Sequence, residues 1–277
     1  MTQSEENNKD TKLIKMKKTI RRFAPAMLVL VALATLSFMG KDSVTLRLRP
    51  QQGKTYTVTS KANMMMMIEV QGQTINQSQN METRQSFTAK EVTNNQTTFE
   101  TQVEAIKMTM SNMGMKFEYD SEHPEKTSPM LADQTKAFDE AIKKPTTVNY
   151  DLMGKVIDSI DMEMSQLGGA IIELPEEALS VGSTWSHDKK QNVSGTDINA
   201  KMTYTVTAIS KKSVDISFTG DVKSTEVSGS YNGTASIDPQ TGMITSSTTK
   251  SNLSMTLNEQ GLSLPVTMVG TTTVEVK

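Results

Sequence analysis

The sequence predicts a mainly β protein of the α+β class, and three observations lead to that prediction. Apolar and polar residues alternate with a period of two over most of the chain, a middle stretch has a helical period, and residues 1–40 have the layout of an export segment. We expect long antiparallel strands forming a strongly curved sheet, or an open half-barrel, over one or two helices. Two sequential antiparallel β-domains joined by a helical segment are the alternative.

Residues 1–40 are expected to be a signal peptide or an N-terminal membrane anchor. A basic run, Lys12–Arg22, leads into the uncharged apolar stretch Phe23–Met39, and the small-x-small pattern Ala32–Ala34 favours cleavage after it. The apolar stretch also has the minimum length of a membrane-spanning helix, so residues 23–39 are the expected membrane contact if cleavage does not occur. Met1 and Met16 are both candidate start residues, because a more ordinary export signal begins at the second.

The composition of residues 41–277 excludes several functional classes. The chain has 29 basic and 31 acidic residues, and the export segment is rich in the basic ones, so the rest is acidic and unsuited to nucleic acid. The absence of cysteine excludes disulfides, thiolate metal sites, thiol catalysis and lipidation at an N-terminal cysteine. We therefore expect an exported β-rich domain, periplasmic or otherwise associated with the cell envelope.

A first strand meander is predicted for residues 43–120. Its strand-forming apolar residues are Val44, Leu46 and Leu48; Tyr56, Val58, Ala62, Met64, Met66, Ile68 and Val70; Ile75, Met81, Phe87 and Ala89; Phe99, Val103 and Ala105; and Met115, Phe117 and Tyr119. Turns are expected at Gly72, at Asn94 and just before Met115. The apolar phase slips by one residue between Ala105 and Ile106, which predicts a β-bulge there.

A helical middle is predicted for residues 128–175. Ser128 followed by Pro129 is a helix start, and the helix is expected to stop before Pro145. Its apolar stripe consists of Met130, Leu131, Ala137, Phe138, Ala141 and Ile142. A short hairpin that turns at Gly154 follows, and a second helix is predicted over Ile160–Ile171.

A second meander is predicted for residues 181–277. Its strand-forming residues are Trp185; Ile198, Ala200, Met202, Tyr204, Val206 and Ala208; Val214, Ile216 and Phe218; Val227, Tyr231, Ala235 and Ile237; Leu253, Met255 and Leu257; and Leu262, Leu264, Val266, Met268, Val274 and Val276. Asp238–Gly242 has the composition of a tight hairpin turn. Both meanders therefore flank the helical middle.

Three segments resemble an uncharacterised family of exported, β-rich bacterial envelope proteins. They are LPEEALSVGSTWSHDK (Leu174–Lys189), FEYDSEHPE (Phe117–Glu125) and IDPQTGMI (Ile237–Ile244). The resemblance covers most of the chain after Lys41, and it supplies turn and strand-end motifs but no catalytic residue. Members commonly have a lipoprotein-type N-terminus, from which this cysteine-free chain departs. The expected architecture also resembles the half-barrel carriers that hold acyl chains or lipoproteins in the periplasm, a likeness of fold only.

Methionine is the residue type in clear excess, with 21 in the chain. Four run consecutively from Met64 to Met67, and four more crowd the hairpin Met108–Met115. Their flexible side chains favour packing in a β core or around an adaptable apolar pocket. A Cu(I) site is the remote alternative, which the alternate facing of successive strand residues disfavours. The residues predicted to line an apolar pocket are Met64, Met66, Ile68, Met108, Met110, Phe138 and Ile142.

No catalytic, cofactor-binding or metal-ligating residue is predicted. The two S-x-x-K sequences, Ser186–Lys189 and Ser247–Lys250, lie in predicted strands, where residues three apart face opposite sides. His123 and His187 lack the short spacing of a zinc motif. We therefore expect a protein without enzyme activity or cofactor. It would be a binding or interaction module for an envelope protein, or alternatively a carrier of a lipid or other apolar ligand in a half-barrel pocket.

Overall fold

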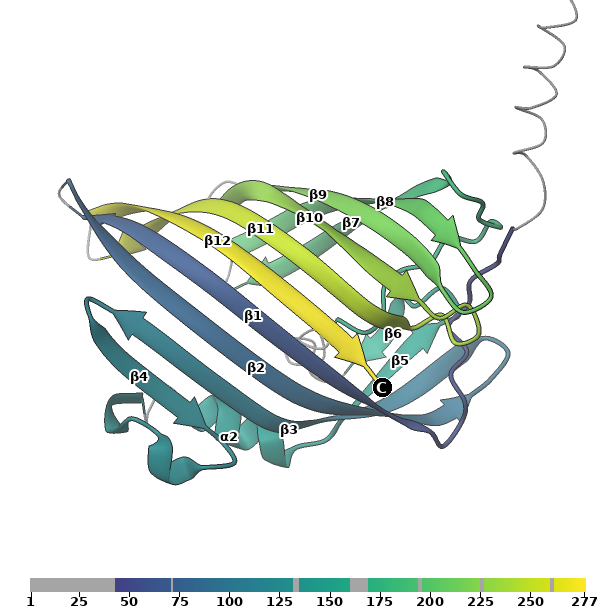
Figure 1. Cartoon of the computed structure of the whole chain (residues 1–277), viewed down its shortest axis with the longest axis horizontal. Coiled ribbons are helices and arrows are strands. Elements are labelled where there is room, and N and C mark those ends of the chain that lie inside the picture. The colour runs from purple at the N-terminus through teal and green to yellow at the C-terminus, as the bar shows by residue number, and fades with distance from the viewer. Residues whose placement is uncertain are drawn as a thin grey trace, which may run out of the picture. The chain divides into compact units, whose positions relative to one another are not determined.

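A single antiparallel sheet contains both predicted meanders (Figure 1). The computed structural model describes residues 43–70, 72–131, 135–159, 169–193, 196–224, 227–259 and 262–277. Its strands are β1 (Thr55–Val70), β2 (Gln73–Val92), β3 (Gln96–Asn112), β4 (Met115–Asp120), β5 (Thr146–Asp151), β6 (Val156–Ser159), β7 (Thr184–Val193), β8 (Thr196–Ile209), β9 (Val214–Lys223), β10 (Val227–Ile237), β11 (Ile244–Glu259) and β12 (Leu262–Val276). The helical elements among these residues are the 3-10 turns η1 (Pro124–Lys126) and η2 (Pro129–Leu131) and the α-helix α2 (Lys136–Lys143). The predicted mainly β class is confirmed, and the described residues do not form the two separate β-domains of the alternative.

The first and last strands pair with each other, which joins the two meanders. Neighbouring strands follow the order β6-β5-β3-β2-β1-β12-β11-β10-β9-β8-β7, and β4 pairs with one end of β3. β1 and β12 are antiparallel from Val58, opposite Val276, to Ile68, opposite Val266. Since β6 and β7 stand at the two edges of the described sheet, the sheet is open and not closed on itself.

Backbone contacts between distant strands show that the sheet is strongly curved. Leu174 donates its N–H to the carbonyl of Met153 at the β5–β6 turn, and Ile244, at the start of β11, donates to the carbonyl of Ala170. In a flat sheet the five strand spacings from β5 to β11 would amount to about 24 Å. The four-residue step from Ala170 to Leu174 reaches at most about 14 Å. The sheet must therefore bend to bring both strands to one segment, and Figure 1 shows this curl.

Extended segments cover the concave side, which we call the inner face, at one end of the strands. These covering segments are residues 43–50, 169–175 and 238–243. Leu46 and Leu174 pack with strands β8 to β11, whereas Leu48, Ala170 and Met243 pack with β1, β2, β3, β5 and β12. The predicted helical cover is present over β3 and β4, where α2 packs on the inner face, whereas extended segments cover these two cores. Leu46 and Leu48 lie on the same side of their extended segment, as residues two apart do, and the segment passes from one core to the other between them.

The predicted strand over Val44–Leu48 is wrong, because these residues belong to a covering segment and not to the sheet. Val44 forms only an isolated bridge with Leu179, and the residues after it pair with no strand. Their alternation arises because Leu46 and Leu48 are both buried against the inner face, while Arg47 between them stays partly exposed. Between them, Arg47 donates from its guanidinium to the carbonyls of Pro175 and Glu176, at 3.1 and 2.8 Å. The covering segments are therefore tied to one another by hydrogen bonds that do not belong to the sheet.

β3 contains the predicted β-bulge. Arg84 of β2 lies opposite Ala105, whereas the next residue, Gln85, lies opposite Val103. Glu104 is the extra residue, and two consecutive side chains beginning at Ala105 are buried. The phase slip in the sequence therefore marks the bulge.

The first predicted helix begins later than the sequence indicates. Residues 129–131 form only the turn η2, and α2 begins at Lys136. Ser128 does not cap a helix because it is bound to β4. Its Oγ accepts the N–H of Glu118 at 2.9 Å, and its own N–H donates to the carbonyl of Glu118 at 2.8 Å. Met130, predicted for the apolar stripe, is consequently exposed.

The second predicted helix, Ile160–Ile171, falls mainly outside the described residues. The part that is described, from Gly169 onward, forms no helix and belongs to a covering segment. The hairpin predicted before it is confirmed as β5 and β6. Within the described ranges, no helix has the length and apolar character needed to span a bilayer. The predicted export segment, residues 1–40, lies outside those ranges.

Two buried tyrosines, one in each core, predict a loss of stability at alkaline pH. Burial raises the pKa of Tyr150 and of Tyr204 from 10.0 to about 12. Below pH 10 the folded and unfolded chains both hold these protons, but between pH 10 and about 12 the unfolded chain loses them first. The free energy of unfolding therefore falls as the pH rises through this window. Replacing Tyr150 by Phe should reduce that slope by up to about 1.4 kcal/mol per pH unit, measured by urea unfolding. A slope equal to that of the unmodified protein would contradict the prediction.

Candidate functional site

The apolar side chains of the inner face become more exposed towards the turns that follow β1 and β3. We call this part the hairpin half, and it consists of the cross-strand rows that contain Met64, Met66 and Ile68. Its apolar residues include Met64, Met66 and Ile68 of β1, Ile75 of β2, Met110 of β3, Phe117 of β4, Leu253 and Met255 of β11, and Val266 and Met268 of β12. Six strands therefore contribute to one continuous apolar surface.

The side chains of the hairpin half are less covered than those at the other end of the same strands. On β1, Tyr56 and Val58 are buried beneath the covering segments. Further along the same face, Met64 is 38% exposed, and Met66 and Ile68 are half-buried. Because water contact with apolar side chains is unfavourable, a face that leaves them half-exposed is a candidate binding surface.

The seven predicted pocket residues come from three elements that meet on the inner face. They are Met64, Met66 and Ile68 of β1, Met108 and Met110 of β3, and Phe138 and Ile142 of α2. β2 separates the first group from the second, and α2 packs on β3 and β4. Met108 is only 6% exposed beneath α2, so its side chain serves packing. A pocket lined by the other six stays a prediction.

α2 is fixed to the sheet through Tyr119 of β4. The rings of Tyr119 and Phe138 lie 5.6 Å apart, and the Tyr119 hydroxyl donates to Asp139 at 2.8 Å. Burial, followed by this hydrogen bond, raises the pKa of Tyr119. The helix therefore borders the hairpin half as a fixed wall on the side of β3 and β4.

Glutamine amides are interleaved with thioethers on this face. Gln77 Nε2 donates to the sulfur of Met110 at 2.9 Å, and Gln79 Nε2 donates to the sulfur of Met108 at 3.3 Å. A thioether is a weak acceptor, so a bound carbonyl oxygen would be a better partner for either amide. The hairpin half thus combines apolar contacts with uncharged hydrogen-bond donors.

The consecutive methionines are divided between the two faces of β1. Met65 lies opposite Val269 and Met67 lies opposite Thr267 of β12, on the side away from Met64 and Met66. The four sulfurs of this run therefore do not converge as a Cu(I) site of four thioethers would require.

The residues of β11 and β12 in this site were not predicted from the sequence. Leu253 and Met255 face inward from β11, and Val266 and Met268 face inward from β12. Their alternation identifies two strands, but only the pairing of β12 with β1 places them beside Met66.

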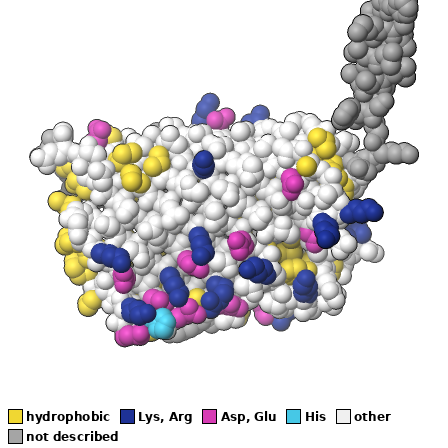
Figure 2. Space-filling view, in the orientation of Figure 1, with side chains coloured by type: hydrophobic (Ala, Val, Ile, Leu, Met, Phe, Trp, Pro, Cys, Tyr) yellow, Lys and Arg dark blue, Asp and Glu magenta, His cyan; other side chains and the backbone are white. Residues whose placement is uncertain are grey.

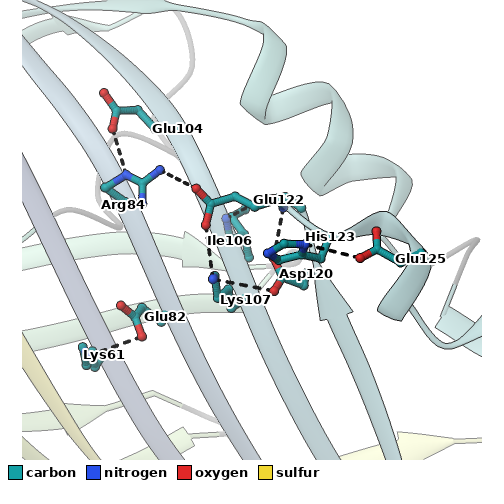
Figure 3. Close-up of polar contacts among 11 residues, drawn as sticks. Lys61, Glu82, Arg84, Glu104, Ile106, Lys107, Asp120, Glu122, His123 and Glu125 are labelled. Atoms are coloured by element: carbon teal, nitrogen blue, oxygen red, sulfur yellow. Dashed lines mark hydrogen bonds and ion pairs between the residues drawn. The ribbon is translucent and has the colours of Figure 1, made fainter.

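A network of ion pairs lies on the outer face, in the cross-strand rows that contain Thr59 and Lys61 of β1 (Figure 3). Arg84 donates to Glu104 at 3.1 Å and to Glu122 at 2.8 Å, and Lys107 lies 3.2 Å from Glu122 and 3.6 Å from Asp120. The hydrogen bond from Arg84, and then that from Lys107, lowers the pKa of the Glu122 carboxyl. These pairs are solvent-exposed and contribute little to stability individually.

The other residues considered for chemistry occupy structural positions. His123 is exposed, with Nδ1 3.3 Å from Glu125 (Figure 3). Across the described ranges, no group of three or more acidic or histidine side chains is placed to hold a metal ion. Both S-x-x-K sequences lie within strands, β7 and β11.

The Leu174–Lys189 segment fastens a covering segment to the edge strand β7. The carbonyl oxygen of Glu173 accepts from Trp185 Nε1 at 3.0 Å and lies 2.8 Å from His187 Nε2. The ring of Trp185 also stacks on Tyr204 at 5.0 Å. This motif therefore holds the cover of the inner face in place.

Comparison with known sequences connects part of the chain to a family. Residues 159–244 match the model of a family of unknown function (DUF6263), a span of less than a third of the chain that includes β7 to β10. No curated protein matches the chain.

Solved structures show a likeness of fold. A structure of lipovitellin that concerns lipid–protein interactions has a TM-score of 0.50 and 13% identity, covering 82% of this chain and 25% of that chain. This chain thus spans about a quarter of the length of the lipovitellin chain. An outer membrane channel from Pseudomonas putida F1 gives a TM-score of 0.37 and 9% identity, covering 86% of this chain and 99% of that chain. The hypothetical lipoprotein YmcC from Escherichia coli K12 gives 0.21 and 12%, covering 76% and 85%. By sequence, residues 159–244 therefore match a family of unknown function, and by fold the curved sheet is similar to that of lipovitellin.

Proposed function

We propose that this protein is a non-catalytic binding module of the cell envelope, and that its hairpin half holds an apolar, acyl-chain-type ligand. The ligand is either a free lipid or the acyl group of a modified protein, since both present the same hydrocarbon. The export-type N-terminal segment supports a location outside the inner membrane. Lipovitellin, which has a similar fold, is described in connection with lipid–protein interactions.

One observation carries the proposal. The inner face of β1 is buried under covering segments at Tyr56 and Val58, but beyond them Met64, Met66 and Ile68 remain partly exposed. Apolar side chains in such a position gain free energy when a hydrocarbon displaces water from them, by roughly 25 cal/mol per Å² removed from water. Methionine suits an acyl chain because its unbranched side chain adapts to a partner without a fixed shape.

A pair of neighbouring methionines provides the test. Met66 faces the ligand surface and Met67 faces the opposite side of the same strand, and both are half-buried. In Met66→Glu, the carboxylate would have to lose its water without a cationic partner when a hydrocarbon binds. We expect binding of a dansyl-labelled fatty acid to weaken by about tenfold or more in Met66→Glu, which corresponds to about 1.4 kcal/mol. Fluorescence titration measures this.

Met67→Glu is the matched control, because it adds the same charge on the outer face. It should bind the probe as the unmodified protein does. Failure of the unmodified protein to bind the probe, or equal weakening in both variants, would contradict the proposed site.

A further inference from the structure

The turn end of the sheet presents a second apolar surface, which is exposed and not half-buried. We call it the methionine surface, and it consists of Met65, Met113, Met115 and Val269. Met113, Met115 and Met65 are 75%, 54% and 47% exposed. Met65 and Val269 are paired across β1 and β12, and Met115 lies opposite the end of β3. Two surface hollows border these residues except Met115, one of about 660 Å³ that includes Met65 and Met113 and one of about 450 Å³ that includes Met65 and Val269.

This end of the sheet carries few charges, and they are of both signs. Between Met64 and Asn80 the charged residue is Glu69, the ranges Met108–Met115 and Leu262–Gly270 have none, and Lys116 next to Met115 is paired with Glu118. Lys250 is the charged residue in the lining of the smaller hollow, whose other polar lining residues are uncharged. Figure 2 shows the contrast, since the charged side chains gather along the lower part of the view and hydrophobic ones gather at its left end.

The backbone at Met113 is a separate observation that points to a binding role. Its φ is +50°, and among the described residues with positive φ it is the one that is not glycine. Met113 and Gly114 form the tight β3–β4 turn, where both residues have positive φ and the first is usually Asn, Asp or Gly. A left-handed conformation costs an ordinary residue about 1–2 kcal/mol. A large apolar side chain is therefore exposed at this turn although its backbone is strained, which points to a role for the side chain in binding.

We infer that the methionine surface docks on a lipid bilayer, inserting Met113 and its neighbours among uncharged headgroups. A protein partner would be recognised through aromatic or arginine anchors, and none of the four residues is of that kind. A neutral surface of flexible apolar side chains, flanked by amides and hydroxyls, fits the neutral interface of a zwitterionic bilayer. Anionic lipid is not required, because the basic residues described beside the surface, Lys116 and Lys250, are matched in number by Glu118 and Glu69. The inference goes beyond the proposed function, since Met113 and Met115 lie at the β3–β4 turn and Met65 and Val269 lie on the outer face, apart from Met66.

The absence of cysteine allows a local test in the full chain. An environment-sensitive fluorophore is attached to Met113→Cys or, as a control, to Val181→Cys. Val181 is also apolar and is 62% exposed, but it precedes β7 and lies outside the methionine surface. With vesicles of phosphatidylcholine alone, the label at position 113 should shift to shorter wavelength and brighten at least about twofold, and the label at position 181 should not respond. Local labels are needed because the apolar segment 23–39 could bring any variant to a vesicle without this surface taking part.

Further measurements separate this docking from its alternatives. High salt should leave the response at position 113 intact, because the contact is apolar. Adding Met65→Lys to the labelled chain should reduce the response, whereas adding Met66→Glu should reduce only fatty-acid binding. No response at 113, an equal response at 181, or a response that needs anionic lipid would overturn the inference. A response at 113 that appears without vesicles and grows with protein concentration would assign the surface to a second copy of the chain instead.

Discussion

Replacing Phe99 by Ala should lower the free energy of unfolding by about 3–5 kcal/mol, the range for removing a fully buried phenylalanine. Phe99 is 0% exposed at the centre of the core that joins β1, β2, β3 and β5. Its ring meets Phe87 and Tyr150 edge-on, at centroid distances of 5.9 and 6.0 Å. In the variant, Phe87 and Tyr150 each lose an aromatic contact. The sheet cannot readily close the cavity, because β3 is paired with a strand on both sides at this position. Urea unfolding followed by circular dichroism measures the change.

Phe117 provides the control for this prediction. It belongs to β4 on the same inner face, but it is only half-buried. Phe117→Ala should therefore cost less than about 2 kcal/mol, because part of the ring is already in contact with water. Equal losses in the two variants would show that the covered end of the sheet is not the more tightly packed end.

Gly242→Ala should destabilise the fold by about 2–5 kcal/mol, for two reasons that add. The φ of Gly242 is +71°, where an L-residue is strained. A Cβ at this position would also lie 2.3 Å from the carbonyl oxygen and 2.6 Å from the carbonyl carbon of Arg47. Because these are backbone atoms of a covering segment, the segment would have to move away from the β10–β11 turn. That movement would loosen Leu46 and Leu48 in both cores.

Gly53 separates the two contributions. It has a similar φ, +80°, but a Cβ there meets nothing within 4 Å. Gly53→Ala should therefore show only the conformational cost of about 1–2 kcal/mol. If both substitutions cost the same in chemical unfolding, the close approach of residues 43–50 to the turn is not a constraint on the fold.

Sequence reasoning succeeded where the cause of the structure is local. Alternation over Tyr56–Val70 predicts β1, and the phase slip at Ala105 predicts the bulge, because side-chain facing depends on neighbouring residues alone. It failed where contacts with residues far along the chain determine the local structure. Residues 44–48 alternate as a strand does, yet they form a cover because no ladder partner is available. Ser128 has the composition of a helix start, but hydrogen bonds to Glu118 engage it instead.

The candidate site was predicted in part for the same reason. Met64, Met66 and Ile68 could be placed on one face by their spacing along β1. The contribution of Met268 could not be predicted, because pairing between the first and last strands is not encoded in either strand alone. Gln77 and Gln79 were missed as well, since polar residues lie on both faces of β2 and their alternation carries no signal of an inner face.

Native mass spectrometry of the intact protein, purified gently from the cells that produce it, tests the binding claim most directly. The unmodified protein should carry the added mass of an acyl-chain-bearing molecule, which extraction into organic solvent releases. Met66→Glu should lose this mass, and Met67→Glu should retain it. Protein that carries no such molecule in any form, and that takes none up from added lipid, would contradict the account.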